Sequence, residues 1–286
     1  MRVISDNYKK IIKARKEGKY MIGVNTQGVK SPFFAIPGII FYNELIPEMD
    51  KDQPFYCFEL CPYTRVEDTA SLYISEMRKV QPVGPYNLCG YCAYGIIAYE
   101  MAQQLLKQGE KVSVLILVDA ALNLIRPKNV KPIKRLFALL LFYLEYYKRK
   151  LQYYNKVIKP LPYIKKASFI SKETLRYLRN RGMVIYRRIT KRYNKQYQHK
   201  EPYTIKPYPG TVTLFKSKIP MPNFSNDPYM GWSRYVTGEI KVYNIEGDHT
   251  SMCHQPAVKD FAKKIRYCLE HQNAGETNSF KLRVNQ

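Results

Sequence analysis

The sharpest local signal in the sequence is the stretch Leu88-Cys89-Gly90-Tyr91-Cys92-Ala93-Tyr94-Gly95. It joins a strand-like run over residues 86–91 to a helical pattern over residues 93–108, in which apolar side chains recur every four residues. The spacing G-x-C-x-x-G is typical of a sharp strand-to-helix turn that holds a nucleophile above a sheet, with Cys92 at the nucleophile position. The sequence therefore predicts that Cys92 projects from such a turn.

Two glycines fit the tight geometry of this turn. A Cβ at Gly90 would collide with the turn itself, and Gly95 allows the new helix to pack closely against the sheet. The helix dipole favours the thiolate form of a cysteine at its N-terminus, which would activate Cys92. Most free cysteines, however, are small buried apolar residues, so this motif alone leaves a catalytic and a structural interpretation open.

Strand-like and helix-like segments alternate on both sides of this turn. Short runs rich in Val, Ile, Phe and Tyr predict strands that are buried on both faces, as in a parallel sheet. Helical patterns lie between them, so we predict an α/β fold with a mostly parallel central sheet and helices on both faces. The predicted strands cover residues 20–24, 32–36, 54–60, 86–91, 112–118, 211–215 and 240–245, and the predicted helices cover residues 42–49, 67–80, 93–108 and 256–269.

Positive charge is concentrated in one segment. The 286 residues carry 47 Lys and Arg against 23 Asp and Glu, a formal net charge of +24. Residues 126–206 hold 23 of these basic residues and three acidic ones, a net of +20. We predict that this segment is a basic helical lid inserted into the core, with helices over residues 133–150 and 171–193. The predicted domain limits are 1–125 for the first part of the core, 126–206 for the lid, 207–272 for the second part of the core and 273–286 for a flexible tail.

Composition excludes several classes of protein. An apolar content of 45% argues against a disordered chain, and six cysteines are too few for a disulfide scaffold of this length. Charged residues occur throughout the first thirty positions, unlike in a signal peptide, and no apolar run approaches the ~20 residues of a membrane span. We expect a cytoplasmic protein.

Two residues beyond the turn complete a candidate catalytic set. Asp119 follows the predicted strand 112–118, and His249 follows the predicted strand 240–245. Nucleophile, acid and histidine follow this order along the chain in α/β-hydrolases, and the carboxyl ends of parallel strands meet at one edge of the sheet. His249 would accept the proton of Cys92, while Asp119 would orient the imidazole and stabilise its charged form.

Other residues compete for these roles. Asp227 is the alternative acid, because it is the only carboxylate between Lys206 and Glu239. The remaining histidines are expected to be surface or packing residues: His199, His254 and His271.

A cysteine pair invites a different interpretation. Cys89 and Cys92 form a C-x-x-C, which occurs in redox and metal sites. A zinc site would need two further ligands, and Cys57 with Cys61 lies on another predicted strand. We therefore expect no metal and no bound cofactor.

Six short motifs together carry a resemblance to a known family. They are Gly84-Pro85-Tyr86-Asn87-Leu88-Cys89-Gly90-Tyr91-Cys92, Ala98-Tyr99-Glu100-Met101-Ala102, Pro32-Phe33-Phe34-Ala35-Ile36-Pro37-Gly38, Asp52-Gln53-Pro54-Phe55-Tyr56, Gly231-Trp232 and Gly247-Asp248-His249. From about Phe33 to Leu269, the chain resembles the thioesterase domains of nonribosomal peptide and polyketide synthases. The resemblance implies an α/β-hydrolase with a helical lid. It also implies an enzyme that takes an acyl or peptidyl chain from the phosphopantetheine thioester of a carrier protein and releases it to water, an amine or a hydroxyl.

The resemblance also assigns roles within the site. It implies a Cys92-Asp119-His249 triad, because in the synthase-fused branch the acid follows the strand after the turn helix. In stand-alone editing thioesterases the acid lies nearer the position of Asp227. The backbone amides of Ala93 and Ile39 would form the oxyanion hole.

The chain departs from the family pattern at three points. Cys92 replaces the usual serine, which favours transfer or cyclisation because a thioester intermediate keeps most of the reactivity of the incoming thioester. Tyr94 stands where the family has glycine, and its ring should alter the packing of the helix or narrow the site. The loop after Gly38 is several residues shorter than usual, which bears on the role of Ile39.

The basic lid allows more than one partner. An acidic carrier protein is the natural complement of a segment with a net charge of +20, and an anionic membrane surface is the alternative. Nucleic acid is not expected, since no known binding motif accompanies the charge. The rival to the enzyme hypothesis is an impaired relative in which Tyr94 and the short loop disable the site and the protein only binds a carrier protein or a membrane.

Overall fold

The computed structural model describes residues 17, 19–59, 61, 65–122, 148, 203–220 and 227–271 of the chain. Apart from Lys148 and residues 203–206, the predicted lid lies outside this part of the chain, as do its predicted helices and the predicted tail. The lid and the domain limits therefore stay predictions.

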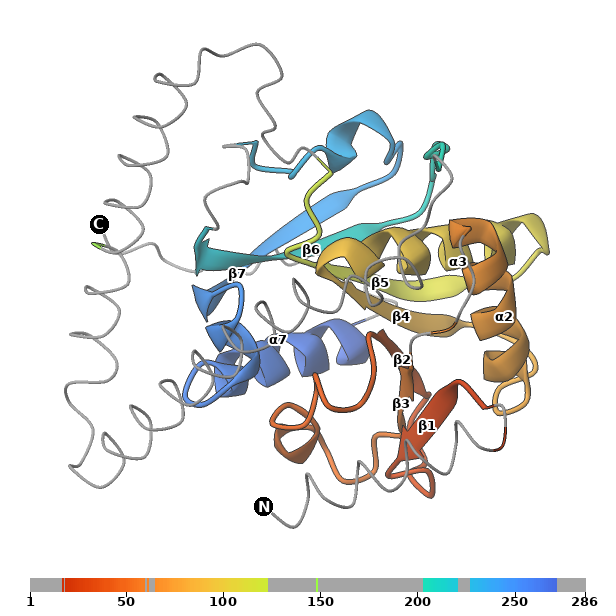
Figure 1. Ribbon diagram of the computed structural model, residues 1–286, viewed down its shortest axis with the longest axis horizontal. Helices are drawn as coiled ribbons and strands as arrows, with labels where there is room; N and C mark the ends of the chain where they lie inside the picture. The colour runs from red at the N-terminus through yellow and green to blue at the C-terminus, as the bar shows by residue number, and fades with distance from the viewer. Residues whose placement is uncertain are drawn as a thin grey trace, which may run out of the picture.

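Within the described residues, seven strands form one sheet in the order β1-β3-β2-β4-β5-β6-β7 (Figure 1). β1 pairs antiparallel with β3, whereas every other neighbouring pair is parallel. The mostly parallel α/β fold predicted from the sequence is therefore confirmed. The strands are β1 (Met21–Val24), β2 (Phe33–Ile36), β3 (Phe55–Phe58), β4 (Tyr86–Tyr91), β5 (Val112–Val118), β6 (Val212–Ile219) and β7 (Ile240–Asp248).

Alternate residues of the strands supply two apolar cores, one on each face of the sheet. Leu88 of β4 packs into the core beneath α2 (Val66–Arg78) and α3 (Gly95–Lys107), and its neighbour Cys89 packs into the core on the opposite face. α7 (Val258–Glu270) covers that second face (Figure 1). Burial on both faces explains why the strands read as nearly continuous apolar runs.

The predicted helix over residues 42–49 is wrong. The structure has tight turns here that end in a short 3-10 helix, η1 (Ile46–Glu48). Tyr42, Leu45 and Met49 are buried with the spacing of a helix, which explains the prediction. Pro47 prevents an α-helix, because it has no N–H to donate to the carbonyl four residues earlier and its ring clashes with that carbonyl.

Two strands extend further than their apolar runs predicted. β6 continues four residues past Phe215, where exposed or half-buried lysines alternate with the buried Ser217. β7 continues to Asp248 and remains paired with β6. These extensions matter because they carry backbone toward the carboxyl edge of the sheet, where the candidate site lies.

None of the helices in the described part of the chain has both the length and the apolar character needed to cross a membrane.

Candidate active site

Cys92 sits on a sharp turn between β4 and α3. It opens a single 3-10 turn, η2 (Cys92–Tyr94), and its φ of +53° lies in the left-handed region that residues with a Cβ rarely adopt. Such a conformation costs on the order of 1–3 kcal/mol, so the surrounding structure must hold it in place. Cys92 is partly exposed, whereas Cys89, three residues earlier, is buried in the sheet.

The two glycines of the turn occupy positions that no larger residue could fill. A Cβ on Gly90 would lie 2.7 Å from the Gly95 Cα and from the Tyr94 carbonyl oxygen. A Cβ on Gly95 would collide with the Cβ of Ala120, just beyond the end of β5. The close approach of α3 to the sheet thus depends on both glycines. Tyr94, in contrast, is accommodated by packing its partly buried ring against the core beneath α2 and α3.

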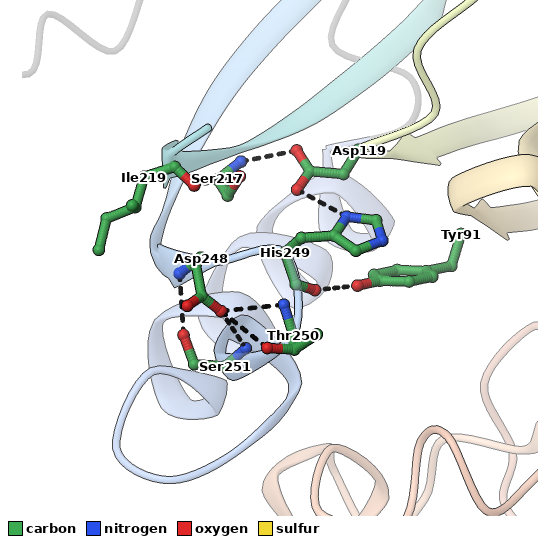
Figure 2. A network of polar contacts seen from close by, with 8 residues as sticks. All are labelled: Tyr91, Asp119, Ser217, Ile219, Asp248, His249, Thr250 and Ser251. Carbon is green, nitrogen blue, oxygen red and sulfur yellow. Dashed lines mark hydrogen bonds and ion pairs between the residues drawn. The ribbon is translucent and has the colours of Figure 1, made fainter. Parts of the chain in front are cut away.

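Asp119 and His249 meet at the carboxyl edge of the sheet, although 130 residues separate them (Figure 2). Asp119 follows β5 and His249 follows β7, and Asp119 Oδ2 lies 3.1 Å from His249 Nδ1. The other carboxylate oxygen of Asp119 accepts a hydrogen bond from the Ser217 amide of β6 at 2.8 Å. Asp119 is 1% exposed, so both oxygens of a buried charge are satisfied within the protein.

The charge on His249 is set by its two neighbours. Burial lowers the pKa of this imidazole, but hydrogen bonds and charge interactions with Asp119 and Cys92 outweigh that effect and raise the pKa from 6.5 to about 9. The imidazolium is therefore the favoured form at neutral pH. An imidazolium between a carboxylate and a cysteine can stabilise a thiolate and later return a proton.

Tyr91, the residue before the nucleophile position, holds the histidine loop. Its hydroxyl donates a hydrogen bond to the backbone carbonyl of His249, and its ring lies 4.7 Å from the imidazole, centroid to centroid (Figure 2). The buried ring thus fixes the loop to β4, the strand that ends directly before Cys92. Sequence reasoning missed this role, although an aromatic residue beside the turn was a visible signal.

The same loop is shaped by Asp248. Its Oδ1 accepts hydrogen bonds from the amides of Thr250 and Ser251 and from the Thr250 hydroxyl, at 2.8–3.0 Å. In Figure 2 this carboxylate faces the turn that follows His249 and not the imidazole ring. Asp248 therefore stabilises the turn after His249, while Asp119 supplies the carboxylate at His249 Nδ1.

The two amides predicted to form an oxyanion hole differ in their surroundings. Ala93 is exposed at the start of the helical turn, where backbone N–H groups point along the axis with few intrahelical acceptors. The Ile39 amide instead donates a hydrogen bond to Oε1 of the buried Glu59 at 3.1 Å. The predicted second donor is thus already engaged by a carboxylate that sequence reasoning overlooked.

The competing candidates have other contacts. Asp227 accepts hydrogen bonds from the amides of Tyr229 and Gly231, both at 2.8 Å, and so shapes a turn. His254 Nδ1 lies 3.0 Å from a carboxylate oxygen of Glu44, outside the Cys92 turn. Among the described residues, no group of three or more His, Cys, Asp or Glu side chains is arranged to hold a metal ion.

Comparison with known proteins identifies the family. The model of the thioesterase domain matches residues 34–267, so the chain belongs to the thioesterase domain family. The chain is 27% identical over 265 residues to a dimodular nonribosomal peptide synthase of Bacillus subtilis (strain 168), covering 88% of this chain and 11% of that protein. It is 37% identical over 94 residues to a non-reducing polyketide synthase of Aspergillus ustus, covering 30% of this chain and 4% of that protein. The resemblance seen in the sequence is confirmed, and the chain spans only a small part of these relatives.

Solved structures with the same fold include two thioesterase domains. The NocB domain, in covalent complex with a fluorophosphonate nocardicin G analogue, has a TM-score of 0.56 at 21% identity, covering 87% of this chain and 99% of that one. The SrfTE domain, described as cyclising the lipopeptide antibiotic surfactin, has a TM-score of 0.54 at 18% identity, covering 90% and 97%. At this level of identity the likeness supports the α/β-hydrolase fold.

The first prediction concerns Tyr91. Tyr91→Phe removes the hydrogen bond to the His249 carbonyl, so kcat for turnover of an acyl thioester should fall about tenfold, at a cost in stability of about 1 kcal/mol. Tyr86→Phe is the matched control, because the Tyr86 hydroxyl also donates to backbone carbonyls, but at the opposite end of β4. A similar loss of stability with unchanged kcat is expected for the control. Equal effects of the two changes on kcat would contradict a positioning role.

The second prediction concerns the charge of His249. In ¹⁵N NMR of histidine-labelled protein, His249 should titrate near pH 9, and Asp119→Asn should lower that value because the neutral amide no longer stabilises the imidazolium. Because the pKa of His249 is higher in the folded state, its protonation adds to the free energy of unfolding. This contribution is complete below the unfolded-state pKa of 6.5 and is lost as pH rises through about 9. The wild type should therefore lose more stability over this interval than Asp119→Asn. Titration of wild-type His249 near 6.5 would contradict the assignment.

Proposed function

We propose that this chain is a thioesterase or acyltransferase that releases an acyl or peptidyl chain from the phosphopantetheine thioester of a carrier protein. Membership of the thioesterase domain family supports the reaction class. The observation that carries the proposal is the contact of 3.1 Å between Asp119 Oδ2 and His249 Nδ1, at the edge of the sheet where Cys92 opens its turn. The proposed catalytic residues are accordingly Cys92, His249 and Asp119.

In the first half of the reaction, Cys92 becomes acylated. In the resting ion pair the thiol proton of Cys92 is already on His249, so the Cys92 thiolate attacks the thioester carbonyl to form a tetrahedral oxyanion, which backbone amides stabilise. The C–S bond to the carrier arm then breaks as a new thioester to Cys92 forms. The imidazolium returns its proton to the departing thiolate, so the carrier protein leaves with a free thiol.

In the second half, an acceptor takes the acyl chain from Cys92. Acylation removes the hydrogen bond and the charge of Cys92 that raise the pKa of His249, so this pKa falls. The neutral imidazole can then accept a proton from water or from a hydroxyl or amine as that group attacks the carbonyl. Breakage of the C–S bond releases the Cys92 thiolate, and the proton taken from the acceptor stays on His249, which restores the resting ion pair. The outcome is hydrolysis, cyclisation or transfer, according to the acceptor.

A cysteine nucleophile suits a demanding acceptor. The thioester on Cys92 keeps most of the reactivity of the carrier-bound thioester, whereas an ester on serine would lose part of it. The partner in this proposal is an acyl or peptidyl carrier protein, and the basic segment 126–206 is its proposed docking region by charge complementarity. Adhesion of the same segment to an anionic membrane surface stays a prediction.

The covalent step gives the third prediction. Incubation with a small acyl thioester should add the mass of one acyl group to the wild type, and Cys92→Ala should abolish the adduct because the attacking sulfur is gone. Cys268→Ala is the matched control, since Cys268 is the other partly exposed cysteine among the described residues. It should keep the adduct. Intact-mass spectrometry distinguishes these outcomes.

The same measurement separates the enzyme from the impaired relative considered above. If no acyl chain of several lengths forms an adduct with the wild type, the proposed activity is wrong and a binding role is favoured. An adduct that persists in Cys92→Ala would move the nucleophile elsewhere.

The fourth prediction distinguishes the two candidate acids. Asp119→Asn should lower kcat by roughly 10⁴-fold, as loss of the buried acid does in serine hydrolase triads. Asp227→Asn should leave kcat nearly unchanged, because Asp227 stabilises a turn by accepting hydrogen bonds from the Tyr229 and Gly231 amides. The reverse result would assign the acid to Asp227 and the protein to the editing branch.

A further inference from the structure

Glu59 contacts the Ile39 amide, the proposed second donor of the oxyanion hole. Along the carboxyl edge of the sheet, β3, β2, β4 and β5 are successive neighbours. The residues that follow these strands include Glu59, Ile39, Cys92 and Asp119, in that order. Glu59 therefore approaches the Cys92 turn from the side opposite Asp119, with the Ile39 amide between them.

The carboxylate of Glu59 packs closely against Gly38, in the loop that follows β2. A Cβ on Gly38 would collide with the carboxyl group of Glu59, so this group lies directly against the Gly38 α-carbon. Glu59 is only 7% exposed, and its backbone is anchored by the Tyr73 hydroxyl and the Tyr20 carbonyl. Glycine at position 38 thus allows a carboxylate to reach the amide of the next residue.

The hydrogen bond to Glu59 competes with the proposed role of Ile39. The Ile39 N–H points at Oε1 of Glu59 at 3.1 Å. An oxyanion held by this amide would compete with Glu59 for the same N–H, and two negative oxygens cannot share one donor without strong repulsion. The Ile39 amide can stabilise the oxyanion only when its hydrogen bond to Glu59 is broken.

We propose that Glu59 is a gate on the oxyanion hole: its carboxylate holds the Ile39 amide in the free protein and releases it when the acyl carbonyl enters the site. This proposal rests on the proposed function, since it assumes that Cys92 is acylated. The gate keeps the hole closed to anions and water until a thioester is positioned at Cys92. Glu59 acts through the amide and is a positioning residue.

Two rates on the same cysteine test the gate. Acylation of Cys92 by a small acyl thioester passes through an oxyanion, whereas its alkylation by iodoacetamide is a direct displacement that needs no oxyanion hole. Glu59→Gln removes the competing charge, so acylation should accelerate by roughly tenfold, within the about 10²–10³-fold that one such donor contributes. Alkylation should change less than about twofold, because no oxyanion forms.

Glu76→Gln is the matched control. Glu76 is likewise 7% exposed, but it lies near the end of α2 and pairs with Lys79. In Glu76→Gln, the rates of acylation and of alkylation of Cys92 should both equal those of the wild type. Where Glu59→Gln does not fold, Glu59→Asp replaces it, because the shorter side chain draws the carboxylate back from the Ile39 amide and should accelerate acylation in the same way.

The outcomes are distinct. Acylation by Glu59→Gln that is equal to or slower than that of the wild type would overturn the gate while leaving the proposed function intact. Acylation and alkylation that accelerate together would also overturn it, since the charge would then act on the Cys92 sulfur and not on the amide. Normal alkylation without any acylation of the wild type or the variants would overturn both proposals.

Discussion

The candidate site depends on one contact, the hydrogen bond between Asp119 and His249 at the carboxyl edge of the sheet. It fixes the orientation of the imidazole, and with Cys92 it raises the pKa of His249 to about 9 despite burial. The contact is itself supported on both sides. The Ser217 amide satisfies the second oxygen of Asp119, and the Tyr91 hydroxyl binds the carbonyl of His249. Four strands of the sheet thus converge on a single ion pair.

Strained backbone surrounds this contact. Cys92 and Asp119 both have positive φ, +53° and +43°, at the points where β4 and β5 end. These conformations turn each chain sharply away from its strand, so that both side chains remain at the edge of the sheet. Dense packing around Gly90 and Gly95 holds the first turn, and the hydrogen bond of the Asp119 amide to the Phe215 carbonyl holds the second. The cost in stability is concentrated where the chemistry is proposed.

Sequence reasoning recovered most of the described fold, because strands buried on both faces leave apolar runs that are easy to recognise. It failed at residues 42–49, where the apolar spacing of a helix was real but Pro47 interrupted the backbone hydrogen bonds. In the candidate site, chain order pointed to the residues that meet at the sheet edge. The contacts of Tyr91, Ser217 and Glu59 were missed because they depend on neighbouring strands that local sequence does not place side by side.

In the proposed mechanism, His249 keeps Cys92 reactive at neutral pH. The measurement is the rate at which iodoacetamide alkylates Cys92 in the wild type and in His249→Ala, followed by intact-mass spectrometry. A thiolate stabilised by the imidazolium reacts faster than a thiol, so the wild type should react roughly tenfold faster or more. Equal rates would show that the imidazole does not act on the sulfur, and that His249 does not activate Cys92.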